Sequence, residues 1–188
     1  MLTSLGYYEF FAGAGMVRLG LGKRWRCLFA NDNSDKKALV YRANFQPASE
    51  LLVRDIAEVE AADLPNRPTL AWASFPCQDL SLAGKGNGLK GKRSGTFWPF
   101  LKLIESLHRR RRGPSIIALE NVVGAITSNQ SQDLKRILEA LAALGYRVGP
   151  MVIDAVNFVP QSRPRLFVVA VRAQKRIPRH LVQSEPDP

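Results

Sequence analysis

The 188-residue sequence is poor in cysteine, in histidine and in long apolar runs. Its two cysteines, Cys27 and Cys77, are too few for a disulfide framework and form no CxxC motif. The two histidines lie far apart, so we expect no metal site. No apolar run reaches the roughly 18 residues of a membrane helix, and the N-terminus lacks the features of a signal peptide. We therefore expect a cytoplasmic protein with no membrane partner.

Acidic residues are also scarce, because 27 Lys and Arg face 16 Asp and Glu, which gives a net charge of +11. Residues 84–112 contain nine basic residues and one acid, Glu105. Residues 163–179 contain six basic residues and no acid. Such concentrations are typical of a surface that binds a polyanion, although a solvated basic surface explains them equally well.

The apolar share of 46% is enough for one domain with its own core. Helical segments are predicted at 16–21, 36–44, 97–108 (with Thr96 as N-cap) and 133–144. Strands are predicted at 7–11, 26–31, 51–54, 69–74, 115–119, 146–154 and 165–171. Strands that alternate with helices predict an α/β fold with a doubly wound, mostly parallel seven-stranded sheet. The last two strands are joined without a helix and should pair antiparallel. Residues 1–173 would form the domain, and the polar tail 174–188 is expected to be unstructured.

Small or polar residues follow the first three predicted strands. A turn over residues 11–15 contains Gly13 and Gly15, and such a turn lets a ligand approach backbone N–H groups. The GxGxxG pattern is incomplete, because Arg18 stands in place of its third glycine. Asp32 and Asp55 follow the second and third strands, where acids can accept hydrogen bonds from an adenosine-type ligand. The structural alternatives are a tight turn and ordinary capping by the two acids.

Three further segments follow later strands of the predicted sheet. Cys77 comes directly after the fourth strand, where a thiol is either a nucleophile or an inert buried group, as expected for Cys27. Glu120 is expected just after the fifth strand, as a ligand-binding acid or a cap. Arg163 and Arg165 precede the last strand, and their alternation should turn one of them toward the crevice. Otherwise both are surface arginines.

In chain order, seven segments resemble the successive motifs of the DNA cytosine-5 methyltransferases. They are FFAGAG, AND, RDI, SFPCQ, RSGTFWPF, ENV and QSRPR, and the resemblance spans about residues 8–171. The resemblance implies a Rossmann-like class I methyltransferase with S-adenosylmethionine across the strand ends. It implies methyl transfer to C5 of cytosine in DNA, as in a restriction-modification system, through a covalent cysteine intermediate on a flipped-out base.

The resemblance also assigns roles to individual residues. The catalytic residues would be Cys77 as nucleophile, Glu120 as the acid that holds the cytosine, and Arg163 and Arg165 beside the base. The cofactor-binding residues would be Phe11, Ala12, Gly13 and Gly15 around the methionine part, Asp32 at the ribose, Asn33, Asp55 and Ile56 at the adenine, and Pro76 and Phe97 at the pocket.

The sequence departs from the family pattern in three places. Glu9 replaces the usual Asp, and Asn33 replaces a bulky residue that would stack on adenine. Family members continue into a target-recognition domain and a final helix that returns to cover the cofactor, whereas this sequence ends soon after its last predicted strand. The expectation is a truncated or split enzyme that needs DNA and a second chain, with the tail 174–188 as the start of the recognition region.

Three other functions stay open from sequence. The first is an RNA cytosine-5 methyltransferase of the same lineage. The second is a catalytically inactive remnant that binds nucleic acid through its basic stretches. The third is a dinucleotide-dependent oxidoreductase, which the incomplete glycine motif disfavours.

Overall fold

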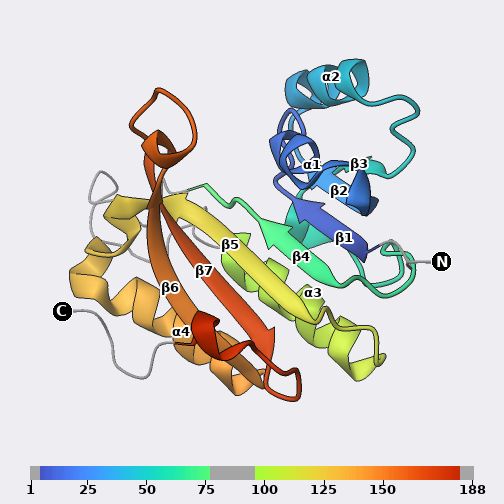
Figure 1. The fold of residues 1–188 in the computed structure, drawn as a ribbon. Coiled ribbons are helices and arrows are strands. Elements are labelled where there is room, and N and C mark those ends of the chain that lie inside the picture. The colour runs from blue at the N-terminus through green and yellow to red at the C-terminus, as the bar shows by residue number, and fades with distance from the viewer. Residues whose placement is uncertain (1–4, 77–95, 183–188) are drawn as a thin grey trace.

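The computed structural model describes residues 5–76 and 96–182 (Figure 1). The strands are β1 (Leu5–Phe10), β2 (Trp25–Asp32), β3 (Leu51–Val53), β4 (Leu70–Ala73), β5 (Ile116–Val122), β6 (Tyr146–Asp154) and β7 (Pro164–Arg172). The helices are α1 (Met16–Leu21), α2 (Asp35–Asn44), α3 (Phe97–Arg109) and α4 (Gln132–Ala143). In these residues no helix is long and apolar enough to cross a membrane.

The seven strands form one sheet in the order β3-β2-β1-β4-β5-β7-β6. The first five of these strands pair in parallel, while β7 pairs antiparallel with both β5 and β6. The predicted fold class, including the antiparallel last strand, is therefore confirmed.

The main core lies between the sheet and the two helices α3 and α4, which lie together behind one of its faces in Figure 1. Alternate strand residues point into this core, as the pleat of a strand requires. Phe10 packs against Phe29 and Phe100 with ring centroids 5.6 and 5.2 Å apart. Helix α3 begins directly after Thr96 with a strongly one-sided apolar pattern, which explains its position against the sheet.

Three details differ from the sequence predictions. Strand β5 continues to Val122, because its pairing with β7 extends to Val122 opposite Arg165, so Glu120 lies inside the strand. Thr96 holds the N-cap position of α3, but its side chain makes no cap hydrogen bond. The tail contains a short 3₁₀ turn at Arg179–Leu181, where no structure was expected.

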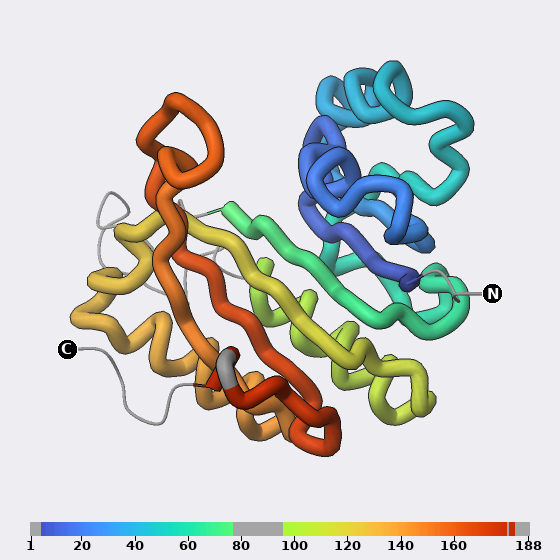
Figure 2. Tube along the Cα trace, in the orientation of Figure 1, coloured from blue at the N-terminus to red at the C-terminus, as the bar shows by residue number. Residues whose placement is uncertain are grey.

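The ends of the strands form two opposite edges of the sheet. The parallel strands end at one edge, called here the carboxyl edge, where β7 begins. They begin at the opposite edge, called here the amino edge, where β7 ends. Helix α3 crosses between the two, and its 13 residues span about 20 Å. Figure 2 shows the end of α3 and the end of β7 at one edge, and the loop between β6 and β7 at the other.

Candidate functional site

The turn after β1 has the backbone conformation that its glycines predict. Gly13 and Gly15 have φ values of 57° and 84°, and Phe11 shares the left-handed region with φ 58°. A Cβ atom on Gly15 would lie 2.2 Å from Cε2 of Phe45, so only glycine fits there. A Cβ on Gly13 would meet no atom within 4 Å. The backbone at Gly13 therefore faces open space that a ligand can enter.

Asp32 fixes this turn to the end of β2. Its Oδ2 accepts a hydrogen bond from the Gly13 amide at 2.9 Å, and its Oδ1 accepts one from the Ser34 amide at 3.0 Å. The Lys37 ammonium lies 3.6 Å from Oδ2, and Asp32 is only 2% exposed. Because each carboxylate oxygen has two lone pairs, the group retains acceptor capacity for a ligand hydroxyl. The structural role and the predicted ribose contact are compatible.

The other predicted cofactor residues near β3 lie in two environments. Asp55 is exposed, and its Oδ1 accepts the Ala57 amide at 2.9 Å, so it caps the 3₁₀ turn Ile56–Glu58. Ile56 is 5% exposed and belongs to the main core. Asn33 is exposed beside Asp32. The turn at Ala12 is held by its amide, which donates to the Asn31 carbonyl at 2.9 Å.

The segment after β4 leads toward the predicted nucleophile. Pro76 is exposed, whereas Phe75 is buried against Phe97 with ring centroids 5.9 Å apart. Phe97 has no exposed surface, so in this conformation its ring is part of the core. Cys77 and the glycine-rich loop that follows it lie outside the described residues, and the role of Cys77 stays a prediction.

Two predicted catalytic residues meet at the carboxyl edge. Arg165 Nε lies 3.1 Å from Glu120 Oε1, and both side chains are about one quarter exposed. Glu120 projects from β5 and Arg165 from the start of β7, which the antiparallel pairing brings side by side. Arg163, just before β7, is exposed and is not part of this ion pair. Of the two arginines it is Arg165 that contacts Glu120, and the predicted roles of both arginines stay predictions.

Asn121 belongs to the ENV segment, but no role for it follows from the sequence. Asn121 is 6% exposed, and its Nδ2 donates to the Phe75 carbonyl at 3.3 Å, while its Oδ1 accepts the Val122 amide at 2.8 Å. This contact joins the end of β5 to the chain two residues before Cys77. Asn121 therefore connects β5 to the segment after β4, and the only sequence feature that pointed to it was its place next to Glu120.

Asp154, at the end of β6, was also missed. Its Oδ1 accepts the backbone amides of Arg163 and Val156 at 2.6 and 3.1 Å, and its Oδ2 accepts the Ser162 hydroxyl at 2.8 Å. These hydrogen bonds hold the pKa of Asp154 below its usual range. The carboxylate closes the loop between β6 and β7 and so fixes the approach of the chain to Arg165.

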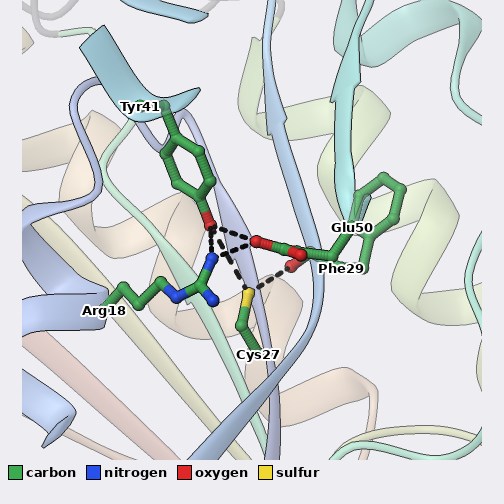
Figure 3. A network of polar contacts seen from close by, with 5 residues as sticks. All are labelled: Arg18, Cys27, Phe29, Tyr41 and Glu50. Atoms are coloured by element: carbon green, nitrogen blue, oxygen red, sulfur yellow. Dashed lines mark hydrogen bonds and ion pairs between the residues drawn. The ribbon is translucent and has the colours of Figure 1, made fainter. Parts of the chain in front are cut away.

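A polar network lies beneath the glycine turn (Figure 3). Arg18 of α1 donates to the Tyr41 hydroxyl at 3.1 Å and to the Glu50 carboxylate, and Tyr41 donates to Glu50 at 3.2 Å. The Arg18 guanidinium also stacks 4.3 Å from the Phe45 ring centroid. Burial raises the pKa of the Cys27 thiol to about 11, which fits the inert thiol expected for Cys27.

Glu9 lies next to this network on β1. It is 1% exposed, and neither carboxyl oxygen has a hydrogen-bond partner among the described residues. Burial raises the pKa of Glu9 to about 7, an effect that the nearby Val17 amide and Arg18 only partly oppose. From the sequence, Glu9 stands out only because it replaces the usual Asp of the family pattern.

Comparison with known proteins gives a consistent result. The family model described as C-5 cytosine-specific DNA methylase matches residues 5–187. Among curated proteins, the chain is 33% identical to type II methyltransferase M.BsuFI of Bacillus subtilis and 34% identical to M.HpaII of Haemophilus parainfluenzae. These alignments cover 88% and 87% of this chain.

The chain spans 39% of the length of M.BsuFI and 45% of that of M.HpaII. Among solved structures, the S. pombe Dnmt2 methyltransferase superposes with a TM-score of 0.73 at 23% identity, over 92% of this chain and 52% of that one. That similarity concerns the fold, whereas the family model covers nearly the whole sequence. The chain therefore belongs to the C-5 cytosine-specific DNA methylase family.

Proposed function

We propose that this chain is the cofactor-binding and catalytic portion of an enzyme that methylates C5 of cytosine in DNA. The observation that carries the proposal is the Glu120–Arg165 pair at the carboxyl edge. It lies beside Asn121, whose side-chain amide donates to the Phe75 carbonyl, and Cys77 follows Phe75 two residues later in the sequence. An acid and a guanidinium side by side provide the acceptor and donors that a cytosine ring requires.

The turn after β1 and the ends of β2 and β3 fit S-adenosylmethionine. Gly13 leaves space for a ligand against its backbone, Asp32 has lone pairs beside that space, and Asp55 is exposed at the next strand end. When bound there, S-adenosylmethionine supplies an electrophilic methyl group. Phe11, Ala12, Gly13 and Gly15 would hold its methionine part.

The chemistry assigned to the chain follows from the weak nucleophilicity of cytosine C5. The Cys77 thiolate adds to C6, which moves electron density to C5 and prepares it for methylation. Glu120 binds N3 and the exocyclic amino group and stabilises the charge that develops on the ring, and Arg165 acts in the same way at O2. Once C5 carries the transferred methyl group, a base removes the C5 proton, and the electrons of the C5–H bond re-form the C5–C6 double bond and expel Cys77 as a thiolate.

The proposal requires a base that has left the duplex stack, because a stacked base exposes neither face to a thiolate. Sequence-specific recognition is assigned to a region outside the part shared with the relatives, on the same polypeptide or on a second one. The 188-residue chain alone is expected to bind S-adenosylmethionine weakly and DNA without sequence preference, with little methyl transfer.

The test traps the covalent intermediate. Duplex DNA that carries 5-fluorocytosine has no C5 proton to lose, so the cysteine adduct should persist on a denaturing gel. The chain is incubated with S-adenosylmethionine and this DNA, alone and with a recognition region supplied as a second polypeptide. Cys77→Ser should abolish the adduct, and the matched variant Cys27→Ser should keep it.

An adduct that survives Cys77→Ser would reject the assigned nucleophile. The absence of any adduct in either arm would reject the proposed catalysis. A parallel arm with fluorocytosine-substituted RNA distinguishes the RNA enzyme, because an adduct formed only in that arm would replace DNA as the substrate.

A further inference from the structure

The amino edge of the sheet gathers a large share of the basic residues. Exposed cations stand just before β2, before β4, after α3, on β6 and after β7. They are Lys23, Arg24, Arg67, Arg109, Arg110, Arg111, Arg147, Lys175 and Arg176. They come from segments far apart in the sequence, and the strand order of the sheet brings the backbone at these positions to one edge.

Backbone hydrogen bonds show that several of these chain segments lie close together at the amino edge. The Arg172 amide donates to the Ser115 carbonyl at 3.0 Å, and the Ser115 amide donates to the Thr69 carbonyl at 3.0 Å. The starts of β4 and β5 and the end of β7 are therefore tied directly together. Figure 1 shows the end of α3 and the arrowhead of β7 at this same edge.

Few acids balance these cations. Glu50 is ion-paired with Arg18, Glu60 lines a hollow together with Lys102 and Arg110, and Glu105 lies one turn earlier on α3. The carboxyl edge, in contrast, carries acids that offset its cations. Asp32, Asp55, Glu120 and Asp154 stand there together with Lys37, Arg54, Arg163 and Arg165. Within residues 5–76 and 96–182, the positive charge is thus displaced toward the edge away from the candidate site.

Some cations of the amino edge serve the fold, and others do not. Arg112 Nε donates to the Asn66 carbonyl at 2.9 Å, and Arg172 Nη1 lies 3.0 Å from His108 Nδ1. Burial, together with Arg172 and Arg67, lowers the pKa of His108 to about 4, as expected where positive charge accumulates. Arg109, Arg110 and Arg111 are exposed, and none of the ion pairs among the described residues includes them.

We propose that the amino edge binds the phosphate backbone of a second DNA duplex, separate from the one whose cytosine reaches the carboxyl edge. The inference rests on the proposed function for its choice of DNA. Duplex DNA carries one negative charge per ~1.7 Å of axis, which suits a row of guanidinium groups along a sheet edge. The two edges are about 20 Å apart along α3, so the protein lies between the two duplexes.

A bridging assay tests this surface directly. The full chain is mixed with a biotinylated 30-base-pair duplex on beads and with a fluorescent duplex of the same length. The wild-type chain should retain the fluorescent duplex on the beads. If three arginines contact phosphates, an increase in salt from 50 to 200 mM should weaken this capture by about 40-fold. Each phosphate contact contributes about −0.9 to the slope of log affinity against log salt concentration.

Two triple variants with equal charge loss separate the surface from net charge. Arg109→Gln/Arg110→Gln/Arg111→Gln should reduce capture of the second duplex at least tenfold while single-duplex binding persists. The control, Lys36→Gln/Lys135→Gln/Arg136→Gln, removes three exposed cations from α2 and α4 and should bridge like the wild type. Equal thermal melting curves verify that both variants fold.

Equal losses in both variants, or no loss in either, would overturn the second surface. The covalent trap at Cys77 reports the proposed function separately. A trapped adduct without bridging would refute only the amino-edge inference. Bridging that depends on the three arginines, with no adduct, would support the surface and refute only the proposed catalysis.

Discussion

The burial of the Glu9 carboxyl predicts how the free energy of unfolding depends on pH. Glu9 is 1% exposed, and its oxygens have no partner among the described residues. The ionised form is therefore disfavoured in the folded chain, and the pKa is raised from 4.5 to about 7. Glu9→Gln keeps the size of the side chain and removes its charge.

The direction in which stability changes with pH follows from the number of protons bound in the folded and unfolded chains. Between pH 4.5 and about 7 the folded chain holds a proton on Glu9 that the unfolded chain has lost, so stability falls as pH rises through this window. Each unit of pKa corresponds to 1.36 kcal/mol, which gives a total effect of about 3 kcal/mol. Glu9→Gln should match the wild type near pH 4.5 and exceed its free energy of unfolding by that amount at pH 8.

The measurement is urea unfolding, followed by circular dichroism, of wild type and variant at pH 5 and pH 8. His108 has a lowered pKa and contributes in the opposite direction in an overlapping window, but it is present in both proteins and cancels in their difference. The exposed Glu58→Gln controls for a general loss of negative charge. A stability difference that stays constant between the two pH values would refute the reasoning.

Three further predictions concern the carboxyl edge. Asp32→Ala and Asp55→Ala should each weaken the binding of S-adenosylhomocysteine, measured by calorimetry, roughly ten- to a hundredfold, because each removes one charge-assisted hydrogen bond. An unchanged dissociation constant in a folded variant would reject the contact. Gly15→Ala should destabilise the fold by about 2–5 kcal/mol in thermal or urea unfolding, because φ is positive and Phe45 fills the space that a Cβ needs. The control Gly20→Ala on α1 should not destabilise it, because a Cβ there meets no atom within 4 Å. Asp154→Asn should speed proteolysis within residues 155–163, and an unchanged cleavage rate would show that its hydrogen bonds do not hold the loop.

Much of the fold was predictable because its signals are local. The apolar strands, the amphipathic helix α4 and the glycine turn each follow from nearby residues. Gly145, with φ 82°, follows α4 in the left-handed conformation that glycine favours after a helix. The antiparallel pairing of the last strands followed from the short connection between them.

The contacts that build the site were less predictable, because they depend on partners distant in sequence. The end of β5 lies at Val122 only because β7 continues the pairing opposite Arg165, more than forty residues later. Asn121 contacts Phe75, which follows β4, and Asp154 contacts Arg163 in the loop that returns to β7. A single sequence identifies these side chains as polar, but their partners become evident only when the sheet order is known.

The basic residues illustrate the same limit and have a consequence for function. Residues 84–112 form one positive stretch in the sequence, and its concentration suggested one surface. The apolar pattern of α3 takes precedence over the charges, because burial of its face against the sheet fixes the direction of the helix. Arg109, Arg110 and Arg111 are thereby carried about 20 Å from the edge where α3 begins. There they join Arg67 and Arg147, with which they share no sequence proximity, so the fold, and not the count of charges, determines where a polyanion can bind.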